Sequence, residues 1–144
     1  MTQWNHRKAN VGDEIPILTL EPISRSTLAI YAGASGDHNP IHIDIDFAKQ
    51  SGLSDVIAHG MLVMAYMGRA LTNAVPQSAI QQFCVEFSSL TQVNDILICS
   101  GKVAERNNNN GQESLTLNLT VYDTKGNQKL NGEAKIIIND HLES

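Results

Sequence analysis

The sequence predicts an α+β domain in which an antiparallel sheet wraps around one long central helix. Residues 60–75 (GMLVMAYMGRALTNAV) are apolar on nearly all sides of a helix, which is typical of a buried helix, and Pro76 ends it. In the strand-like second half of the chain, apolar residues over 115–121 recur with a period of two. A sheet that wraps the helix buries it economically on every side. The residues expected in its buried surface are Met61, Leu62, Val63, Met64, Ala65, Met67, Ala70 and Leu71.

The first part of the chain is expected to supply one strand and one helix. Residues 14–20 (EIPILTL) predict a strand, with Pro16 placing it at a sheet edge or a bulge. Ser24 is the expected N-cap of a helix over RSTLAIYAGA. Gly33 and Gly36 are expected to end that helix.

A bend and a short helix are expected next. Asn39–Pro40 forces an extended bend, because a residue that precedes proline avoids the α region. Asp44 can cap a short helix over IDFAKQSG, which Gly52 stops. This segment therefore leads from the first helix to the central one by a compact polar turn.

Four strands are expected after the central helix. The turn sequences VND, NNNNG and TKGN between them suit antiparallel hairpins. Asn110–Gly111 in particular is a dipeptide that a tight hairpin favours, because both residues tolerate a positive φ. The expected strands cover residues 83–88, 96–103, 115–121 and 130–138.

The composition indicates one domain over residues 1–144, since 144 residues with 42% hydrophobic content can bury a sizeable core. A net charge of −5 and a pI near 5.4 argue against nucleic acid as a partner. The N-terminus has no secretory pattern, and the longest apolar stretch is interrupted by His59 and Arg69, so no membrane span and a cytoplasmic location are expected. Cys84 and Cys99 are expected to be reduced thiols in the core.

The stretch YAGASGDHNPIHIDID, residues 31–46, could in principle be a metal loop, a catalytic pair or a polar turn. His38 and His42 are four residues apart, but Pro40 between them disfavours a helix with both on one face. The stretch also lacks the glycine of a calcium loop and the cysteines of many zinc sites. No metal is therefore expected.

Asp37 and His42 are the candidate catalytic pair. A bend at Asn39–Pro40 can bring a carboxylate and an imidazole to one point, where they can hold a water and transfer its proton. The alternative is a capped turn in which Asp37 only caps the backbone. Spacing by itself favours the turn over the pair.

The sequence AHGM places Gly60 in the first turn of the central helix, where free N–H groups and the positive end of the helix dipole lie. An N–H aimed at a carbonyl oxygen would stabilise an enolate or oxyanion, so Gly60 strengthens the catalytic interpretation. His59 is expected to cap or pack beside the helix start and not to catalyse. Gly68, two turns later, either leaves room beside an acyl chain or allows close helix–sheet packing.

These residues resemble the signature of the MaoC-like (R)-specific enoyl-CoA hydratases and the related (3R)-hydroxyacyl-ACP dehydratases. The family pattern S-G-D-x-N-P-I-H-x-D, then A, G and I-A-H-G-M, is complete within residues 31–71. The resemblance implies a hot-dog fold, with Asp37 and His42 as the catalytic pair and Asn39 supporting it. It also implies that the Gly60 N–H polarises a thioester carbonyl, and that the protein forms a homodimer or a larger homo-oligomer.

The expected activity is therefore (R)-specific hydration of trans-2-enoyl thioesters to (3R)-3-hydroxyacyl thioesters, and the reverse dehydration, in fatty acid metabolism. The thioester carrier is CoA or acyl carrier protein, and no metal or other cofactor is expected. Two alternatives stay open, because a fold does not fix a function. They are an acyl-thioesterase on the same fold, and a subunit of a heterodimeric (3R)-hydroxyacyl-ACP dehydratase.

Overall fold

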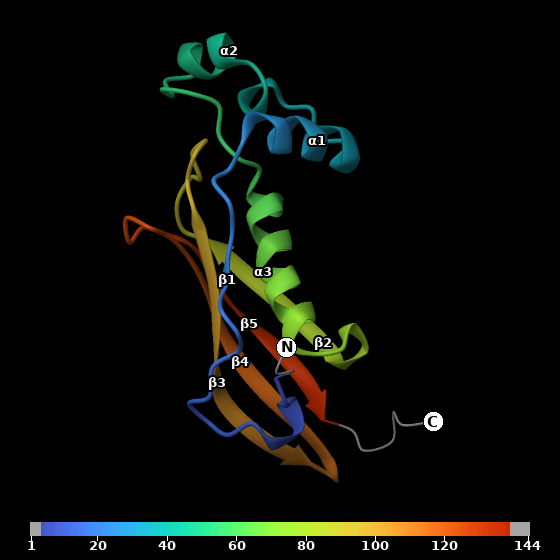
Figure 1. Cartoon of the computed structure of the whole chain (residues 1–144). Helices are drawn as coiled ribbons and strands as arrows, with labels where there is room; N and C mark the ends of the chain where they lie inside the picture. The colour runs from blue at the N-terminus through green and yellow to red at the C-terminus, as the bar shows by residue number, and fades with distance from the viewer. Residues whose placement is uncertain (1–3, 139–144) are drawn as a thin grey trace.

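The computed structural model describes residues 4–138, in which one antiparallel sheet packs against a long helix (Figure 1). The sheet order is β1-β3-β4-β5-β2. The helix, α3 (Gly60–Ala74), crosses one face of the sheet, and two shorter helices lie beyond its N-terminal end. This confirms the predicted α+β class. The strands are β1 (Leu18–Thr19), β2 (Ile80–Phe87), β3 (Leu97–Asn109), β4 (Gln112–Asp123) and β5 (Gln128–Ile138).

The predicted first strand, over residues 14–20, is reduced to the two residues of β1. Leu18 pairs with Cys99 of β3, and a separate bridge joins Glu14 to Lys102. Pro16 lies between these two contacts and has no N–H to donate, so it interrupts the ladder. β1 is an edge strand, as predicted.

The helix caps predicted from the sequence are confirmed. Ser24 accepts a hydrogen bond at the start of α1 (Arg25–Ser35), and Asp44 does the same for α2 (Ile45–Gln50). Gly36 ends α1 with a left-handed φ of 77°. The expectation that Gly33 also ends this helix is wrong, because Gly33 lies inside α1, where its helical neighbours supply the hydrogen bonds. Between the two helices lies a 3-10 turn, η2 (Pro40–His42).

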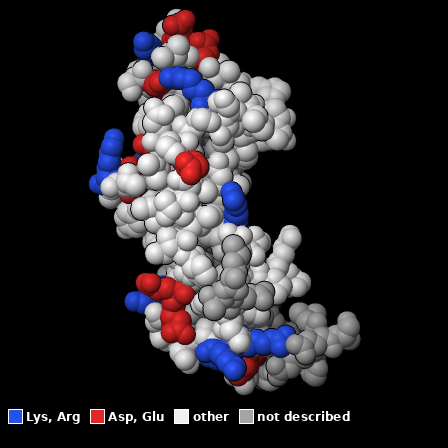
Figure 2. Space-filling model, viewed as in Figure 1, with Lys and Arg blue, Asp and Glu red and all other residues white. Residues whose placement is uncertain are grey.

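The sheet covers α3 on one side only. Met67 and Leu71 are fully buried, whereas Met61 is 56% exposed. Met61 heads a stripe of exposed residues that runs along the opposite side of the helix through Ala65, Arg69 and Thr72. Burial on every side, and a core position for Met61 and Ala65, were therefore wrong predictions for the single chain, because one curved sheet cannot surround a helix. Figure 2 shows few charged side chains over the middle of this face.

Two of the three predicted hairpins are confirmed, at Asn110–Gly111 between β3 and β4, and around Gly126 between β4 and β5. The hairpin predicted at residues 93–95 is wrong. β2 pairs with β5 and β3 pairs with β1 and β4, so residues 88–96 form a crossing loop between two strands that are not neighbours. The alternating pattern of residues in β2 and β3 predicts that each is a strand, but it does not indicate which strand each one pairs with.

Cys99 and Cys84 differ in their surroundings, although both are free thiols. Cys99 is buried, and burial raises its pKa to about 12. Cys84 is exposed on the edge strand β2, so its predicted core position is wrong. Within residues 4–138, no helix is long and apolar enough to cross a membrane.

Candidate active site

Asp37 and His42 meet across the turn that follows α1. Asn39 caps η2, because its side-chain oxygen accepts a hydrogen bond from the N–H of Ile41 at 3.1 Å. The Asn39 N–H in turn donates to Oδ1 of Asp37 at 3.2 Å. The other carboxylate oxygen of Asp37, Oδ2, lies 3.8 Å from Nε2 of His42. That separation is too long for a direct hydrogen bond, and a water molecule could contact both atoms.

The ring of His42 is held in one orientation by the main chain. Its Nδ1 lies 2.8 Å from the carbonyl oxygen of Ile57. A carbonyl oxygen can only accept, so Nδ1 carries the hydrogen, and in the neutral ring the lone pair is on Nε2, which faces Asp37. The His42 side chain is 11% exposed and that of Asp37 is 53% exposed, so the pair opens to solvent on the Asp37 side.

His59 links both members of the pair. It is buried, and its ring stacks on that of His42 with centroids 3.8 Å apart. Its Nε2–H donates to the backbone carbonyl of Asp37 at 3.1 Å, and Tyr31 of α1 contacts its ring edge-on at 4.8 Å. His59 packs beside the helix start, as predicted, and makes no side-chain cap. Its contact with Asp37 spans 22 positions, a distance at which sequence patterns carry no signal.

Gly60 begins α3 directly after His59, whose ring stacks on His42. Within residues 4–138, the N–H of Gly60 has no hydrogen-bond partner. The ring of Phe87, at the end of β2, lies against Gly60, where a Cβ would be 3.3 Å from Cε1 of Phe87. The absence of a side chain thus leaves the positive end of the α3 dipole accessible to a carbonyl oxygen. Phe87 was predicted only as a strand residue.

Asp37, His42 and His59 are also where a metal ion could bind, because each offers a ligand atom and these atoms lie within 4.8 Å of one another. Two of the four ring nitrogens already donate to backbone carbonyls. Nδ1 of His59 is buried and has no partner among the described residues. Half of the ring nitrogens are thus used in hydrogen bonds that hold His42 and His59 in place. The expectation that no metal binds stays a prediction.

Gly68 lies two turns after Gly60 on α3, next to β2. A Cβ at Gly68 would be 3.4 Å from the ring of Phe83, an ordinary contact. Together with Ala65 and Phe83 it lines an open hollow of about 510 Å³ between α3 and β2. The position is therefore compatible with both predicted roles, close packing and space for a chain.

The sheet, the central helix and the Asp–His pair at the helix start define a hot-dog domain with a site suited to proton transfer and carbonyl binding. The chain belongs to the MaoC-like family, because the family model described as "MaoC like domain" matches residues 8–124.

Relatives of known name agree with this assignment. The structure superimposes on R-hydratase PhaJ1 from Pseudomonas aeruginosa with a TM-score of 0.80 and 26% identity, covering 93% of this chain and 84% of that one. The (R)-specific enoyl-CoA hydratase of Rhodospirillum rubrum is 37% identical over 54 residues, 38% of each chain. Fatty acid synthase subunit beta of Saccharomyces cerevisiae is 32% identical over 94 residues, 63% of this chain and 5% of that protein. The matches thus cover well under two thirds of both curated relatives.

Proposed function

We propose that this protein is an (R)-specific hydro-lyase that hydrates trans-2-enoyl thioesters to (3R)-3-hydroxyacyl thioesters and catalyses the reverse dehydration. The observation that carries the proposal is the 3.8 Å gap between Oδ2 of Asp37 and Nε2 of His42. The ring of His59 stacks on His42, and the next residue, Gly60, has an N–H without a hydrogen-bond partner among the described residues. The family, and the names of the similar hydratases, support it.

In the proposed mechanism, one water molecule lies between Asp37 and His42. The thioester oxygen accepts a hydrogen bond from the N–H of Gly60, which makes C3 of the enoyl group electrophilic and stabilises the enolate. As the water oxygen bonds to C3, the pair takes up a proton from it, and C2 receives a proton by way of the same pair. Dehydration follows the reverse course.

The reaction moves only water and protons, so its steps need neither a metal nor a redox cofactor. The substrate is a thioester of CoA or of acyl carrier protein. Asn39 supports the pair by holding one oxygen of Asp37, and Gly68 provides space beside the acyl chain. A cytoplasmic location and the absence of a nucleic-acid or membrane partner remain predictions.

The test is hydration of crotonyl-CoA, with chiral analysis of the product. Asp37→Asn and His42→Ala should each lower the rate by about 10²–10⁴-fold, because each removes one proton-transfer group. Circular dichroism should show that both variants stay folded. His38→Ala is the matched control, since His38 is exposed and lies outside the pair. Full activity in either site variant would exclude this mechanism.

The same assay separates the alternatives. A thioesterase on this fold would release free CoA, which a thiol-reactive dye detects, whereas a hydratase leaves the thioester intact. A non-catalytic subunit of a heterodimer would be inactive when purified by itself. Activity of the isolated protein without release of free thiol therefore supports the hydro-lyase.

The proposal includes a homodimer or a larger homo-oligomer. Apolar side chains around the site are about half exposed in the single chain: Ile43 at 51%, Met61 at 56%, Phe87 at 52% and Leu90 at 53%. β2 is at the sheet edge, with one side unpaired within the described chain. A second copy would bury these groups. Native mass measurement tests this, and Phe87→Glu should shift the protein toward the monomer.

A further inference from the structure

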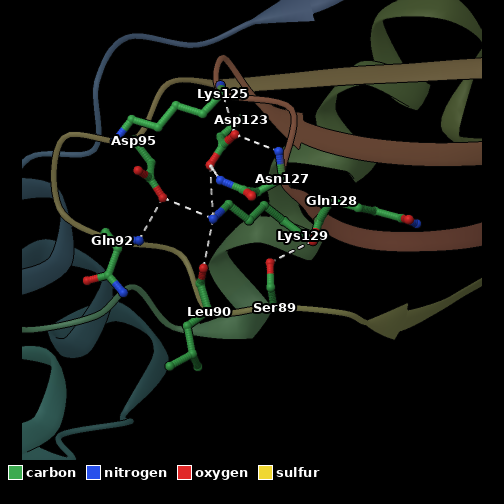
Figure 3. Close-up of polar contacts among 9 residues, drawn as sticks. All are labelled: Ser89, Leu90, Gln92, Asp95, Asp123, Lys125, Asn127, Gln128 and Lys129. Atoms are coloured by element: carbon green, nitrogen blue, oxygen red, sulfur yellow. Dashed lines mark hydrogen bonds and ion pairs between the residues drawn. The ribbon is translucent and has the colours of Figure 1, made fainter. Parts of the chain in front are cut away.

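A buried ionic cluster lies at the start of β5, outside the Asp37–His42 pair (Figure 3). Lys129 is only 4% exposed. Its ammonium donates to the carbonyl oxygen of Leu90 at 2.8 Å and lies 3.1 Å from Oδ2 of Asp95 and 3.2 Å from Oδ2 of Asp123. Lysine is almost never fully buried unless paired, so the three oxygens explain how the charge is tolerated here.

Asp123 ties this cluster to the β4–β5 turn. Its carboxylate accepts hydrogen bonds from the N–H groups of Lys125 and Asn127 and from the side-chain amide of Asn127. Burial alone would raise the pKa of Asp123, but these hydrogen bonds and that from Lys129 outweigh burial and lower the pKa to about 2. Hydrogen bonds to Asp123 thus close the turn, and beside it the Lys129 side chain extends toward the crossing loop of residues 88–96.

The crossing loop is held to β5 by several bonds. Lys129 contacts it at Leu90 and Asp95, and Oδ2 of Asp95 also accepts the N–H of Gln92 at 2.8 Å. The start of the loop is fixed where the N–H of Ser88 donates to the carbonyl of Lys129 and the Ser89 hydroxyl donates to Gln128. The Lys129 ammonium therefore anchors the middle of a segment whose first residues are already bound to β5.

The anchored part of the loop is the part that contacts the active site. The N–H of Ala58 donates to the carbonyl of Thr91 at 2.8 Å, and Ile57 forms an isolated bridge with Gln92. Ile57 is the residue whose carbonyl orients the His42 ring. Leu90, whose carbonyl binds Lys129, is thus followed directly by Thr91 and Gln92, the two loop residues that contact Ala58 and Ile57.

We propose that Lys129 and Asp95 are positioning residues for His42, acting through the crossing loop and the carbonyl of Ile57. The inference deepens the proposed function and rests on it. A buried ion pair is a weak source of stability compared with apolar packing of the same volume. What the Lys129 ammonium adds is a directional bond to a backbone carbonyl, which fixes where the loop lies. Neither residue touches the substrate.

The first test is Lys129→Met, assayed at a temperature where circular dichroism shows the variant fully folded. Loss of the bond to Leu90 should let Ile57 shift, and His42 with it. The expected result is a fall in kcat of about 10-fold to 100-fold with KM little changed, because sub-ångström to ångström misplacement of a reacting group has effects of this size. A residue that only stabilises the fold would leave kcat unchanged once the protein is folded.

A second variant removes the charge imbalance that Lys129→Met creates. In Lys129→Met/Asp95→Asn/Asp123→Asn, the asparagine oxygens can still accept the turn and loop N–H groups, and no carboxylate is left unpaired. Stability should rise above that of Lys129→Met while kcat stays low, because Leu90 remains unbound. This variant carries the test if Lys129→Met does not fold. Recovery of wild-type kcat together with stability would overturn the proposal.

Arg106→Met is the matched control. Arg106 also donates to a backbone carbonyl, that of Ala9 at 2.8 Å, and contacts a carboxylate, that of Glu113, but on the half of β3 remote from the site. Its loss should lower stability and leave kcat unchanged. An equal fall of kcat in Arg106→Met and Lys129→Met would show a general structural effect and overturn the assignment.

A spectroscopic measurement separates this inference from the proposed activity. In protein with isotope-labelled histidine, the Nδ1–H signal of His42, hydrogen-bonded to Ile57, should be present in the wild type and in Arg106→Met. It should be lost or shifted in both Lys129 variants. An unchanged signal in them would refute the positioning role, whatever the activity. If the wild type does not hydrate crotonyl-CoA, the proposed function fails and this signal still decides the positioning.

Discussion

The two hairpin turns of the sheet use their polar residues in different ways. At the β3–β4 hairpin, remote from the helices in Figure 1, Asn110 and Gly111 adopt positive φ values of 53° and 86°, and the Gly111 N–H donates to Asn108 within the same turn. At the β4–β5 turn, Asp123 also binds its own turn, but Lys129 beside it reaches a loop 39 positions away in the sequence. Both turns are exposed at their tips, but the β4–β5 turn is flanked by two buried charged residues, Asp123 and Lys129, and is connected to a distant loop.

This difference distinguishes the two ends of the sheet. The end with the β4–β5 turn and the crossing loop, here called the site end, has long-range polar contacts that lead to His42. The end with the β3–β4 hairpin, the hairpin end, has polar contacts that close on themselves or on Ala9. Equal perturbations at the two ends should therefore change stability alike and activity differently.

Among the changes that test this comparison of the two ends, the largest expected effect comes from His59→Ala. The change removes a buried ring that stacks on His42 and donates to Asp37, and kcat should fall by about 10-fold to 100-fold as both groups lose their alignment. The free energy of unfolding should fall by about 3 kcal/mol. Leu115→Ala is the control at the hairpin end, where Leu115 is fully buried. Leu115→Ala should lose a similar free energy of unfolding, measured in urea, and keep its kcat. A fall of kcat in Leu115→Ala would contradict the difference between the two ends.

The next effect is on acid stability. The pKa of Asp123 is lowered from 3.8 to about 2 in the fold, so its charged form stabilises the protein fully above pH 3.8, and this contribution is lost as the pH falls from 3.8 toward 2. Asp123→Asn should be less stable than the wild type at neutral pH, and the difference should shrink across that interval. Unfolding followed by circular dichroism at several pH values measures it. A constant difference down to pH 2 would contradict the assigned shift.

A smaller effect separates the two glycines of α3. Gly60→Ala places a Cβ 3.3 Å from Phe87, beside the N–H proposed to bind the thioester oxygen, and should lower kcat/KM by about 10-fold. Gly68→Ala, with its Cβ 3.4 Å from Phe83, should gain about 1 kcal/mol from helix propensity. It should keep activity on crotonyl-CoA and lose activity on longer acyl chains. If the preference for acyl chain length is unchanged, the role of Gly68 is close helix–sheet packing and not space for the acyl chain.

The smallest effect is expected at the hairpin end. Asn110→Val puts a β-branched residue into the left-handed region and should lower the free energy of unfolding by about 1 kcal/mol, with kcat unchanged. Asn110→Gly should differ little from the wild type. Any change of kcat in Asn110→Val would show that the hairpin end also communicates with the site.

The features that follow from local rules were predictable from the sequence. Ser24 and Asp44 cap their helices, and Asn110–Gly111 forms its turn, because each depends on residues within a few positions. The bend at Asn39–Pro40 also belongs to this group. The meeting of Asp37 with His42 does not, because spacing by itself favoured a capped turn, and the pair was predicted from Gly60 and the family resemblance.

The features that depend on distant parts of the chain were not predictable. The pairing of β2 with β5 is set by which strand edges meet after collapse, so the alternating pattern did not contain it. The contact of His59 with Asp37 and the burial of Lys129 arise the same way. Lysine in a strand pattern indicates a solvent-facing position, and only the folded neighbours Asp95 and Asp123 reverse that expectation.

The hydrogen bond from His42 to Ile57 has a consequence for engineering. The acceptor is a main-chain oxygen, and such an oxygen is present whatever side chain residue 57 carries. The orientation of the His42 imidazole is thus independent of the side chain of the residue that orients it. Exchange of Ile57 for other apolar residues should therefore keep the bond that holds the His42 ring in its tautomer.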